Sequence, residues 1–199
     1  MRPTREVATN NGQTYFVTSN TIQRKCFFRS EDWCDLFVET LYGYRPDRFA
    51  IHGFVVMEDH FHLLMTPAES LERAVQMVKG GFSFRVKKHL GWNGDVWGAG
   101  FSDHRIRDVD DFEVHQRYIA KNAAECRGVE RAVDHRYCSA GGRFELDAFP
   151  RGLKPGFVGV PNGAAEAAPL QGHSGQTEAT HLRREKQEDL STSSRLESE

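Results

Sequence analysis

The chain lacks several features that would assign it to common classes of protein. Its 199 residues include four cysteines, Cys26, Cys34, Cys126 and Cys138, with no CxxC spacing, so neither a zinc knuckle nor a disulfide framework is indicated. No apolar run approaches the roughly 18 residues of a membrane span, and the polar start has no apolar segment typical of a signal peptide. The GxxxxGKS/T pattern of phosphate-binding loops is also absent. We therefore expect a cytoplasmic protein with free thiols, no membrane association and no nucleotide cofactor.

An overall excess of positive charge is missing as well. Lys and Arg number 26 against 28 Asp and Glu, and the net charge of −2 excludes a globally basic nucleic-acid binder but not a locally basic one. Between residues 71 and 107, seven basic residues stand against three acidic ones, a stripe that suits phosphate contacts. Trp97 and Phe101 in the same region could stack on exposed bases. The alternatives are a solvated helix face for the basic residues and a lid over the core for Trp97. The candidate DNA-binding residues are Lys79, Arg85, Lys87, Lys88, Trp97, Arg105 and Arg107.

The composition changes sharply after Lys154. Beyond it, Phe157 is the only aromatic residue, and Gly, Ala, Ser, Thr, Gln and charged residues dominate. Such a segment buries too little apolar surface to offset the entropy of ordering its backbone. We expect a flexible N-terminus at residues 1–12, one folded domain at 13–154 and a disordered polar tail at 155–199, with residues 141–154 forming a strap over the domain.

Strand and helix patterns alternate along the folded part. Apolar and β-branched runs predict strands at 14–19, 49–57, 60–66 and 101–107. Helical spacing predicts one helix between Ser30 and Pro46, a second over 70–90 that is kinked or loosened at Gly80-Gly81, and a third from Asp108 to about Cys126. The order is that of an α+β, ferredoxin-like (RRM-like) split βαβ fold, in which helices cover one face of an antiparallel sheet, followed by a C-terminal helix. The fold alone does not decide the function.

A histidine pair on the third predicted strand is the most informative feature. Residues two apart on a strand point to the same face, so His60 and His62 project side by side, while Phe61 and Leu63 point the other way. Two imidazoles placed in this way can share one cation. The alternative is that both are ordinary polar residues on a half-exposed strand.

The last predicted helix carries a tyrosine one turn before an asparagine. Tyr118 and Asn122 share a helix face because they are four residues apart, and His115 and Asp111 continue that face toward the start of the helix. A neighbouring stripe of Phe112, Gln116, Ile119 and Ala123 could lie on the sheet. Tyr118 could also be a core or rim aromatic residue. Mg²⁺ or Mn²⁺ accepts imidazole nitrogen and amide oxygen and leaves positions open for a phosphate.

Together these motifs resemble the single-tyrosine HUH transposases, most closely their REP-associated tyrosine transposase branch. The strand motif HFHLL at 60–64 and the helix motif YIAKN at 118–122 carry the resemblance, with linking blocks at 78–85 and 96–104. It extends over about residues 14–154. Three positions depart from the usual family pattern. Ala123 stands where a proline is usual, Gly98 stands where a glutamine is usual, and Asp59 stands where an asparagine is usual.

The resemblance implies a metal-assisted DNA strand transfer. Tyr118 would be the nucleophile that attacks a phosphodiester in single-stranded DNA next to a palindromic hairpin, leaving a 5′-phosphotyrosine and a free 3′-OH. His60, His62 and Asn122 would hold Mg²⁺ or Mn²⁺, which polarises the phosphate for a weakly nucleophilic phenol. His115 is a reserve candidate, as a third ligand or as a proton acceptor. Members of this family act as monomers or homodimers.

Two other functions remain open at this stage. The domain could be a hairpin-binding module for single-stranded DNA or RNA that does not cleave. It could also be a metal-dependent nuclease in which water is the nucleophile.

Overall fold

The structure is a computed structural model that describes residues 12–125 and 131–154. The chain divides into two compact units, Met1–Val158 and Gly159–Glu199, and every described residue belongs to the first. The expected polar tail at 155–199 lies outside the described residues, as do residues 1–11 of the expected flexible N-terminus.

Four strands form one antiparallel sheet in the order β2-β3-β1-β4. This order, with a helix after β1 and another after β3, confirms the ferredoxin-like α+β fold. The tight turn at Glu58-Asp59 joins β2 to β3, and Met57 N donates a hydrogen bond to His60 O across it. The strands are β1 (Tyr15–Asn20), β2 (Phe49–Val56), β3 (His60–Pro67) and β4 (Ser102–Arg105); the helices are α1 (Glu31–Tyr44), α2 (Leu71–Leu90) and α3 (Val109–Glu125).

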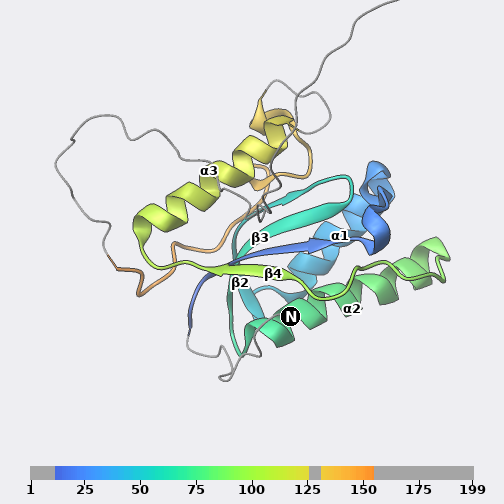
Figure 1. The fold of residues 1–199 in the computed structure, drawn as a ribbon, viewed down its shortest axis with the longest axis horizontal. Coiled ribbons are helices and arrows are strands. Elements are labelled where there is room, and N and C mark those ends of the chain that lie inside the picture. The colour runs from blue at the N-terminus through green and yellow to red at the C-terminus, as the bar shows by residue number, and fades with distance from the viewer. Residues whose placement is uncertain (1–11, 126–130, 155–199) are drawn as a thin grey trace, which may run out of the picture. The chain divides into compact units, whose positions relative to one another are not determined.

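The helices α1 and α2 cover one face of the sheet (Figure 1). Every second residue of β3 points to this face, so Phe61, Leu63 and Met65 are buried in the larger core. Aromatic rings dominate this core, and Phe37 of α1 meets Phe61 and Phe82 at ring-centroid distances of 4.8 and 5.2 Å. No helix in the described part of the chain is long and apolar enough to cross a membrane.

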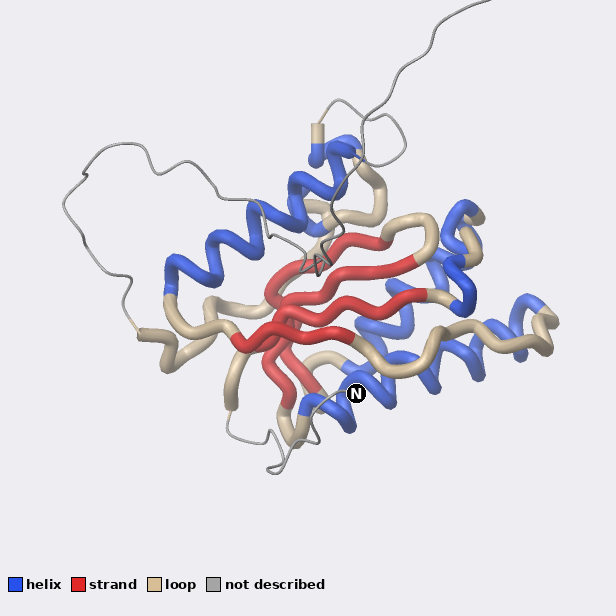
Figure 2. The backbone as a smooth tube through the Cα atoms, viewed as in Figure 1, coloured by secondary structure: helices blue, strands red, loops and turns tan. Residues whose placement is uncertain are grey.

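The third helix, α3, lies on the opposite face of the sheet (Figure 2). The Asp108 carboxylate caps its first turn, because Oδ1 accepts a hydrogen bond from Asp111 N at 2.8 Å. Ile119 and Ala123 are buried against the sheet, and a Cβ atom at Gly53 would lie 3.1 Å from Ile119 Cδ1, so glycine permits this close approach. Gln116 Nε2 also donates to a β2 carbonyl, that of His52. The predicted stripe of α3 therefore does pack on the sheet.

The sequence prediction was wrong for two local features. The Gly80-Gly81 pair does not interrupt α2, which is helical from Leu71 to Leu90. Instead, a Cβ atom at Gly81 would collide with the Tyr44 hydroxyl and ring, so this glycine lets α1 and α2 pack closely. The fourth strand is also shorter than the predicted 101–107, because pairing with β1 covers only Ser102–Arg105.

The segment after α3 returns along β2. Val56 N donates to Tyr137 O, and the Ser139 hydroxyl joins the Phe54 backbone, so residues 137–139 extend the sheet past β2. Asp147 then receives hydrogen bonds from Ile51 N at 2.7 Å and from Arg45 Nε at 2.8 Å. Burial alone would raise the pKa of Asp147, but these two bonds lower it. Within the predicted strap at 141–154, Asp147 therefore joins β2 to the end of α1.

Candidate active site

The two histidines of β3 face each other on the α3 side of the sheet. His60 Nε2 and His62 Nε2 lie 3.2 Å apart, and their ring centroids are 4.8 Å apart. The strand alternation that buries Phe61 on the opposite face sends both imidazoles to this one. His62 is 4% exposed, whereas the side chain of His60, nearer the turn, is 15% exposed. One ring nitrogen of each histidine is therefore directed at the same point.

The other ring nitrogen of each histidine is held by an oxygen. Asp59 Oδ1 lies 2.7 Å from His60 Nδ1, and Thr18 Oγ1 lies 2.7 Å from His62 Nδ1. A carboxylate can only accept, so the Nδ1–H of His60 donates to Asp59 and a neutral His60 ring carries its lone pair on Nε2. Carboxylates and hydroxyls that orient histidines in this way are typical of metal sites. The pair therefore fits a divalent cation.

The buried position of His62 keeps its ring neutral. Burial, with smaller contributions from the neighbouring His60 and Arg24, lowers the pKa of His62 from 6.5 to about 3. A neutral imidazole has a lone pair to offer a metal ion, whereas an imidazolium does not. The site therefore keeps His62 in the ligand form at neutral pH.

Tyr118 of α3 lies beside this pair. Its ring centroid is 5.3 Å from that of His62, in an edge-on arrangement, and the residue is 44% exposed. Asn122, one turn later and half-buried, donates its Nδ2–H to Tyr118 O at 2.8 Å. The amide nitrogen makes that bond, so Asn122 Oδ1, the atom suited to a hard cation, is not used in it. The phenol ring is at the rim of the site and is not part of the core.

Phe16 of β1 connects the aromatic rings around the site. Its ring stacks on His62 at 5.2 Å, meets Tyr118 edge-on at 5.6 Å and lies 4.7 Å from His115. Phe16 is 8% exposed and belongs to the small core under α3. Because it contacts rings on both β3 and α3, Phe16 fixes the spacing between the histidine pair and the tyrosine helix.

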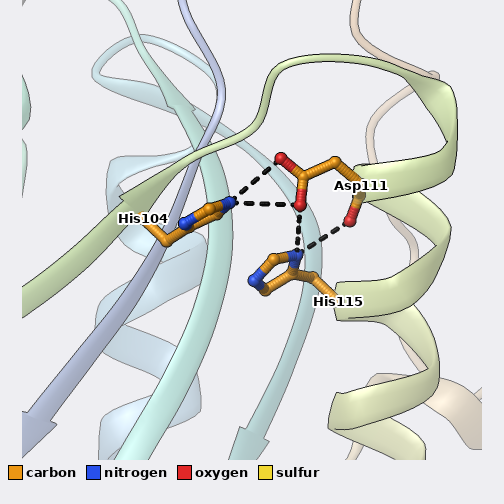
Figure 3. Close-up of side chains that lie close together, drawn as sticks. All are labelled: His104, Asp111 and His115. Carbon is orange, nitrogen blue, oxygen red and sulfur yellow. Dashed lines mark hydrogen bonds and ion pairs between the residues drawn. The ribbon is translucent and has the colours of Figure 1, made fainter. Parts of the chain in front are cut away.

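His115 Nδ1 contacts Asp111 and not the His60–His62 pair. This Nδ1 lies 2.8 Å from Asp111 O and 3.3 Å from Asp111 Oδ1. His104 Nε2 of β4 lies 3.0 Å from Asp111 Oδ2 (Figure 3). Burial alone would raise the pKa of Asp111, but hydrogen bonds from His104 and Arg107 lower it. The Asp111 carboxylate therefore contacts both His104 and His115.

Two of the candidate DNA-binding residues have structural roles. Lys79 Nζ donates to Gly98 O at 3.0 Å and Gly100 O at 2.7 Å, and burial lowers the pKa of this amine. Trp97 Nε1 donates to Lys79 O, and the Trp97 ring packs on Phe61 and Phe82. Trp97 therefore packs on the core, and its stacking on exposed bases stays a prediction. Both residues fix the loop before β4.

Four of the other five basic candidates lie on the α1 and α2 side of the sheet. Arg105 pairs with Tyr15 in the sheet register, and Tyr15 belongs to the core under α1 and α2, so Arg105 lies on that face of β4. Arg85 is on α2, where Nη1 is 3.8 Å from Glu39 of α1, and Lys87 and Lys88 are exposed in the last turns of α2. Arg107 is bonded to Asp111 by its Nε at 3.2 Å.

A groove lies along the end of β1. Its volume is about 640 Å³, and Thr18, which bonds to His62, is part of its wall. Arg24 also lines the groove and is tied to Asp59 at 2.7 Å. The remaining lining residues are Asn20, Thr21, Gln23, Gly98, Ala99, Gly100, Phe101 and Ser102. The loop that Lys79 and Trp97 hold therefore forms one wall of this groove.

The sequence analysis missed four residues of the site: Phe16, Thr18, Arg24 and Asp59. Thr18 pairs directly with His62 between β1 and β3, a register that no single segment reveals. Asp59 was noted only as a departure from the usual asparagine. In the structure this departure places a carboxylate behind His60, so it is compatible with a metal ligand at that position.

A split βαβ sheet that bears two facing imidazoles beside a helix-borne tyrosine defines the HUH class of DNA-processing proteins. A sequence profile described as "Transposase IS200 like" matches residues 13–122. The profile covers more than half of the chain, so the chain belongs to the IS200-like transposase family. This membership confirms the family resemblance and gives the chain a transposase-like, DNA-binding role.

Comparison with solved structures agrees with this fold. The chain is similar to a REP-associated tyrosine transposase bound to a REP hairpin, with a TM-score of 0.57 and 22% sequence identity over 75% of this chain and 92% of that one. It also aligns with a crystal structure from Deinococcus radiodurans, provisionally assigned as a transposase, at a TM-score of 0.39 and 19% identity over 59% of this chain and 95% of that one. No curated protein matches the chain.

Proposed function

We propose that this protein cleaves and rejoins single-stranded DNA next to a palindromic hairpin, through a covalent bond to Tyr118. The observation that carries the proposal is the pair of Nε2 atoms, 3.2 Å apart, beside the exposed ring of Tyr118. The similar REP-associated tyrosine transposase is bound to a REP hairpin, and this supports the substrate class.

In the proposed step, Tyr118 Oη attacks the phosphorus of a phosphodiester. The Oη–P bond forms and the P–O3′ bond breaks, so the DNA 5′ end is held as a phosphotyrosine. The phenol loses its proton and the leaving 3′ oxygen gains one, so the step releases a 3′-OH with no net change in protons. Attack by a 3′-OH reverses the step and rejoins a strand. The bond energy is kept in the covalent intermediate, so no nucleotide cofactor is required.

His60, His62 and Asn122 would hold Mg²⁺ or Mn²⁺. When bound, the ion polarises the scissile phosphate and neutralises the charge that develops on it. Asp59 and Thr18 orient the two imidazoles. Burial keeps the His62 ring neutral, so this ring need not lose a proton before it binds the ion. Phe16 holds α3 at the spacing that brings the phenol to the phosphate.

The groove along the end of β1 is a path for the single strand toward the histidine pair. Arg24 supplies a positive charge in it, and the loop held by Lys79 supplies backbone groups. Arg85, Lys87, Lys88 and Arg105 lie on the other side of the sheet, so they would contact phosphates of the hairpin and not those of the cleaved strand. Their replacement by alanine should weaken hairpin binding and reduce its salt dependence.

The decisive experiment incubates the protein with a single-stranded hairpin oligonucleotide and Mn²⁺, followed by denaturing electrophoresis. We expect a covalent protein–DNA adduct that is absent in Tyr118→Phe, because only the nucleophilic oxygen is removed. Tyr42→Phe is the matched control, since it removes a phenol hydroxyl that is bonded to the Glu145 carbonyl, away from the site. Cleavage that survives in Tyr118→Phe would indicate water as the nucleophile, and hairpin binding without any cleavage would indicate a binding module.

Removal of a histidine ligand tests the metal role separately. His60→Ala should abolish adduct formation and leave hairpin binding largely unchanged, because the imidazole serves the reaction more than the grip on DNA. His89→Ala, at the exposed end of α2, should leave both unchanged. Binding is measured by electrophoretic mobility shift with Mn²⁺ omitted. An equal loss of binding and cleavage in His60→Ala would show that the histidines are structural.

A further inference from the structure

The N-terminal turns of α3 and the edge strand β4 meet at a second cluster of metal-ligating side chains. His104 of β4 and Asp111 and His115 of α3 each present one ligand atom, and these three atoms lie within 4.8 Å of one another (Figure 3). Two imidazole nitrogens and one carboxylate oxygen form a ligand set that suits Zn²⁺. We propose that His104, Asp111 and His115 bind a zinc-type divalent cation at a site distinct from the His60–His62 pair.

The distances within this cluster are close to those that an ion requires. His104 Nε2 lies 3.1 Å from Asp111 Oδ1, and His115 Nδ1 lies 3.3 Å from the same oxygen. A tetrahedral Zn²⁺ with bonds of about 2.0–2.2 Å separates its ligands by roughly 3.3–3.6 Å. The carboxylate would need to shift by a few tenths of an ångström, whereas the two imidazole nitrogens, which lie within 4.8 Å of each other, would move together by up to about 1 Å around an ion. The fourth position would be left to water.

The two oxygens of Asp111 have different surroundings. Oδ2 accepts hydrogen bonds from Arg107 N at 3.1 Å and Arg107 Nε at 3.2 Å, which fix the plane of the carboxylate. Oδ1 lies 3.1 Å from His104 Nε2 and 3.3 Å from His115 Nδ1, and Oδ2 also lies 3.0 Å from His104 Nε2. Hydrogen bonds that orient a carboxylate through its second oxygen are typical of metal sites. The Asp111 side chain is 8% exposed, so it is held in this orientation within the fold.

The imidazole rings are also arranged for a shared ligand. His104 and His115 stack with ring centroids 4.7 Å apart and planes 20° apart, although they come from different elements. The Nδ1–H of His115 donates to Asp111 O at 2.8 Å. Binding of a cation at Nδ1 would displace this proton, as is general for histidine ligands. His104 is 44% exposed on its side chain, which gives the ion a route from solvent.

An ion at this site would fasten α3 to the sheet. His115 precedes Tyr118 by three residues on the same face of α3, and His104 pairs with Phe16, whose ring contacts both His115 and His62. The site would therefore act as a structural clamp on the helix that carries the tyrosine. The inference does not rest on the proposed strand transfer, because its ligands and its test are separate from cleavage.

The test uses the full chain with the first histidine pair removed. His60→Ala/His62→Ala, freed of metal with a chelator, is titrated with Zn²⁺ in competition with a chromophoric zinc chelator and is followed by thermal unfolding. We expect one Zn²⁺ per chain and a higher melting temperature with Zn²⁺. Adding His104→Ala should lower the affinity at least 100-fold and abolish the shift, whereas adding His89→Ala should change neither.

Two results would overturn the proposal. The first is that His60→Ala/His62→Ala binds no Zn²⁺ although circular dichroism shows it folded, which would leave a metal-free hydrogen-bonded cluster. The second is that adding His104→Ala leaves the affinity unchanged. If the double variant does not fold, the same titration compares the unmodified protein with Asp111→Asn, which keeps the side-chain size; the proposal then requires a loss of one Zn²⁺ per chain.

Discussion

The two faces of the sheet are both buried, yet they carry different chemistry. Under α1 and α2 the sheet contributes Phe61, Leu63 and Met65 to an aromatic and aliphatic core. Under α3, the next residues along the same strand contribute His60 and His62 among hydrogen-bonding partners. One face thus supplies the free energy that holds the fold, and the other uses that stability to keep polar groups in place. A single alternating strand serves both, because its side-chain period is two.

The largest effect on folding is expected from truncating the aromatic core. Phe37 is fully buried and contacts the rings of Phe28, Phe61 and Phe82. Phe37→Ala should lower the free energy of unfolding by about 3–5 kcal/mol, because it removes buried surface and leaves a cavity. Urea denaturation measures the change. Phe84→Ala, on a ring that is 66% exposed on α2, is the matched control and should change it by less than about 0.5 kcal/mol. Equal decreases in the free energy of unfolding in both variants would show that the buried aromatic core does not supply this stability.

A smaller effect is expected at the contact between α1 and α2. Gly81→Ala places a methyl group against the ring of Tyr44 and should destabilise the protein by about 1–3 kcal/mol. Gly80→Ala, its neighbour, meets no atom within 4 Å and should stabilise the protein by about 0.5–1 kcal/mol through helix propensity. Thermal unfolding of the two variants measures both signs. A stabilising Gly81→Ala would show that Tyr44 yields easily and that the close approach is not required.

A buried histidine on the α3 face of the sheet should make the free energy of unfolding decrease in acid. Burial lowers the pKa of His52, whose Nε2 lies 2.8 Å from Thr66 Oγ1. Above pH 6.5 the ring is neutral in both the folded and the unfolded chain, so its contribution to stability is complete there. As the pH falls below 6.5, the unfolded chain gains a proton that the folded chain does not. The free energy of unfolding should then decrease by about 1.4 kcal/mol per pH unit until the folded ring titrates.

His52→Gln is the variant that isolates this contribution. It should reduce the pH dependence of urea denaturation below pH 6.5, by at most about one proton, measured with a chelator present so that metal binding does not interfere. His89→Gln, which alters an exposed ring on α2, should leave the dependence unchanged. An unchanged slope in His52→Gln would mean that the ring is protonated in the folded state as well.

Most of the fold was accessible from sequence because local patterns specify it. Apolar and β-branched runs placed β1, β2 and β3, helical spacing placed α1, α2 and α3, and Asp108 marked the start of α3. The prediction was wrong at Gly80-Gly81, since the role of that pair depends on Tyr44, which is distant in sequence. A local rule of helix breaking cannot include a contact with another helix.

The candidate site was predictable only in part, for the same reason. His60 and His62 share a face by their spacing, and Tyr118 and Asn122 share one by theirs, so the sequence indicated two separate motifs. Sheet order and the packing of α3 placed the tyrosine 5.3 Å from His62. Tertiary structure also assigned Trp97 to the core, separated Arg105 from the histidine face and joined His104 to His115 through Asp111.

The sequence by itself determined which side chains share a strand face or a helix face, because the periods of backbone structure are fixed by local geometry. Only the tertiary structure decided which faces meet, because strand register and helix packing are set by contacts between residues that are remote along the chain. The proposed active site lies at such a meeting, where β3 supplies the imidazoles and α3 supplies the phenol.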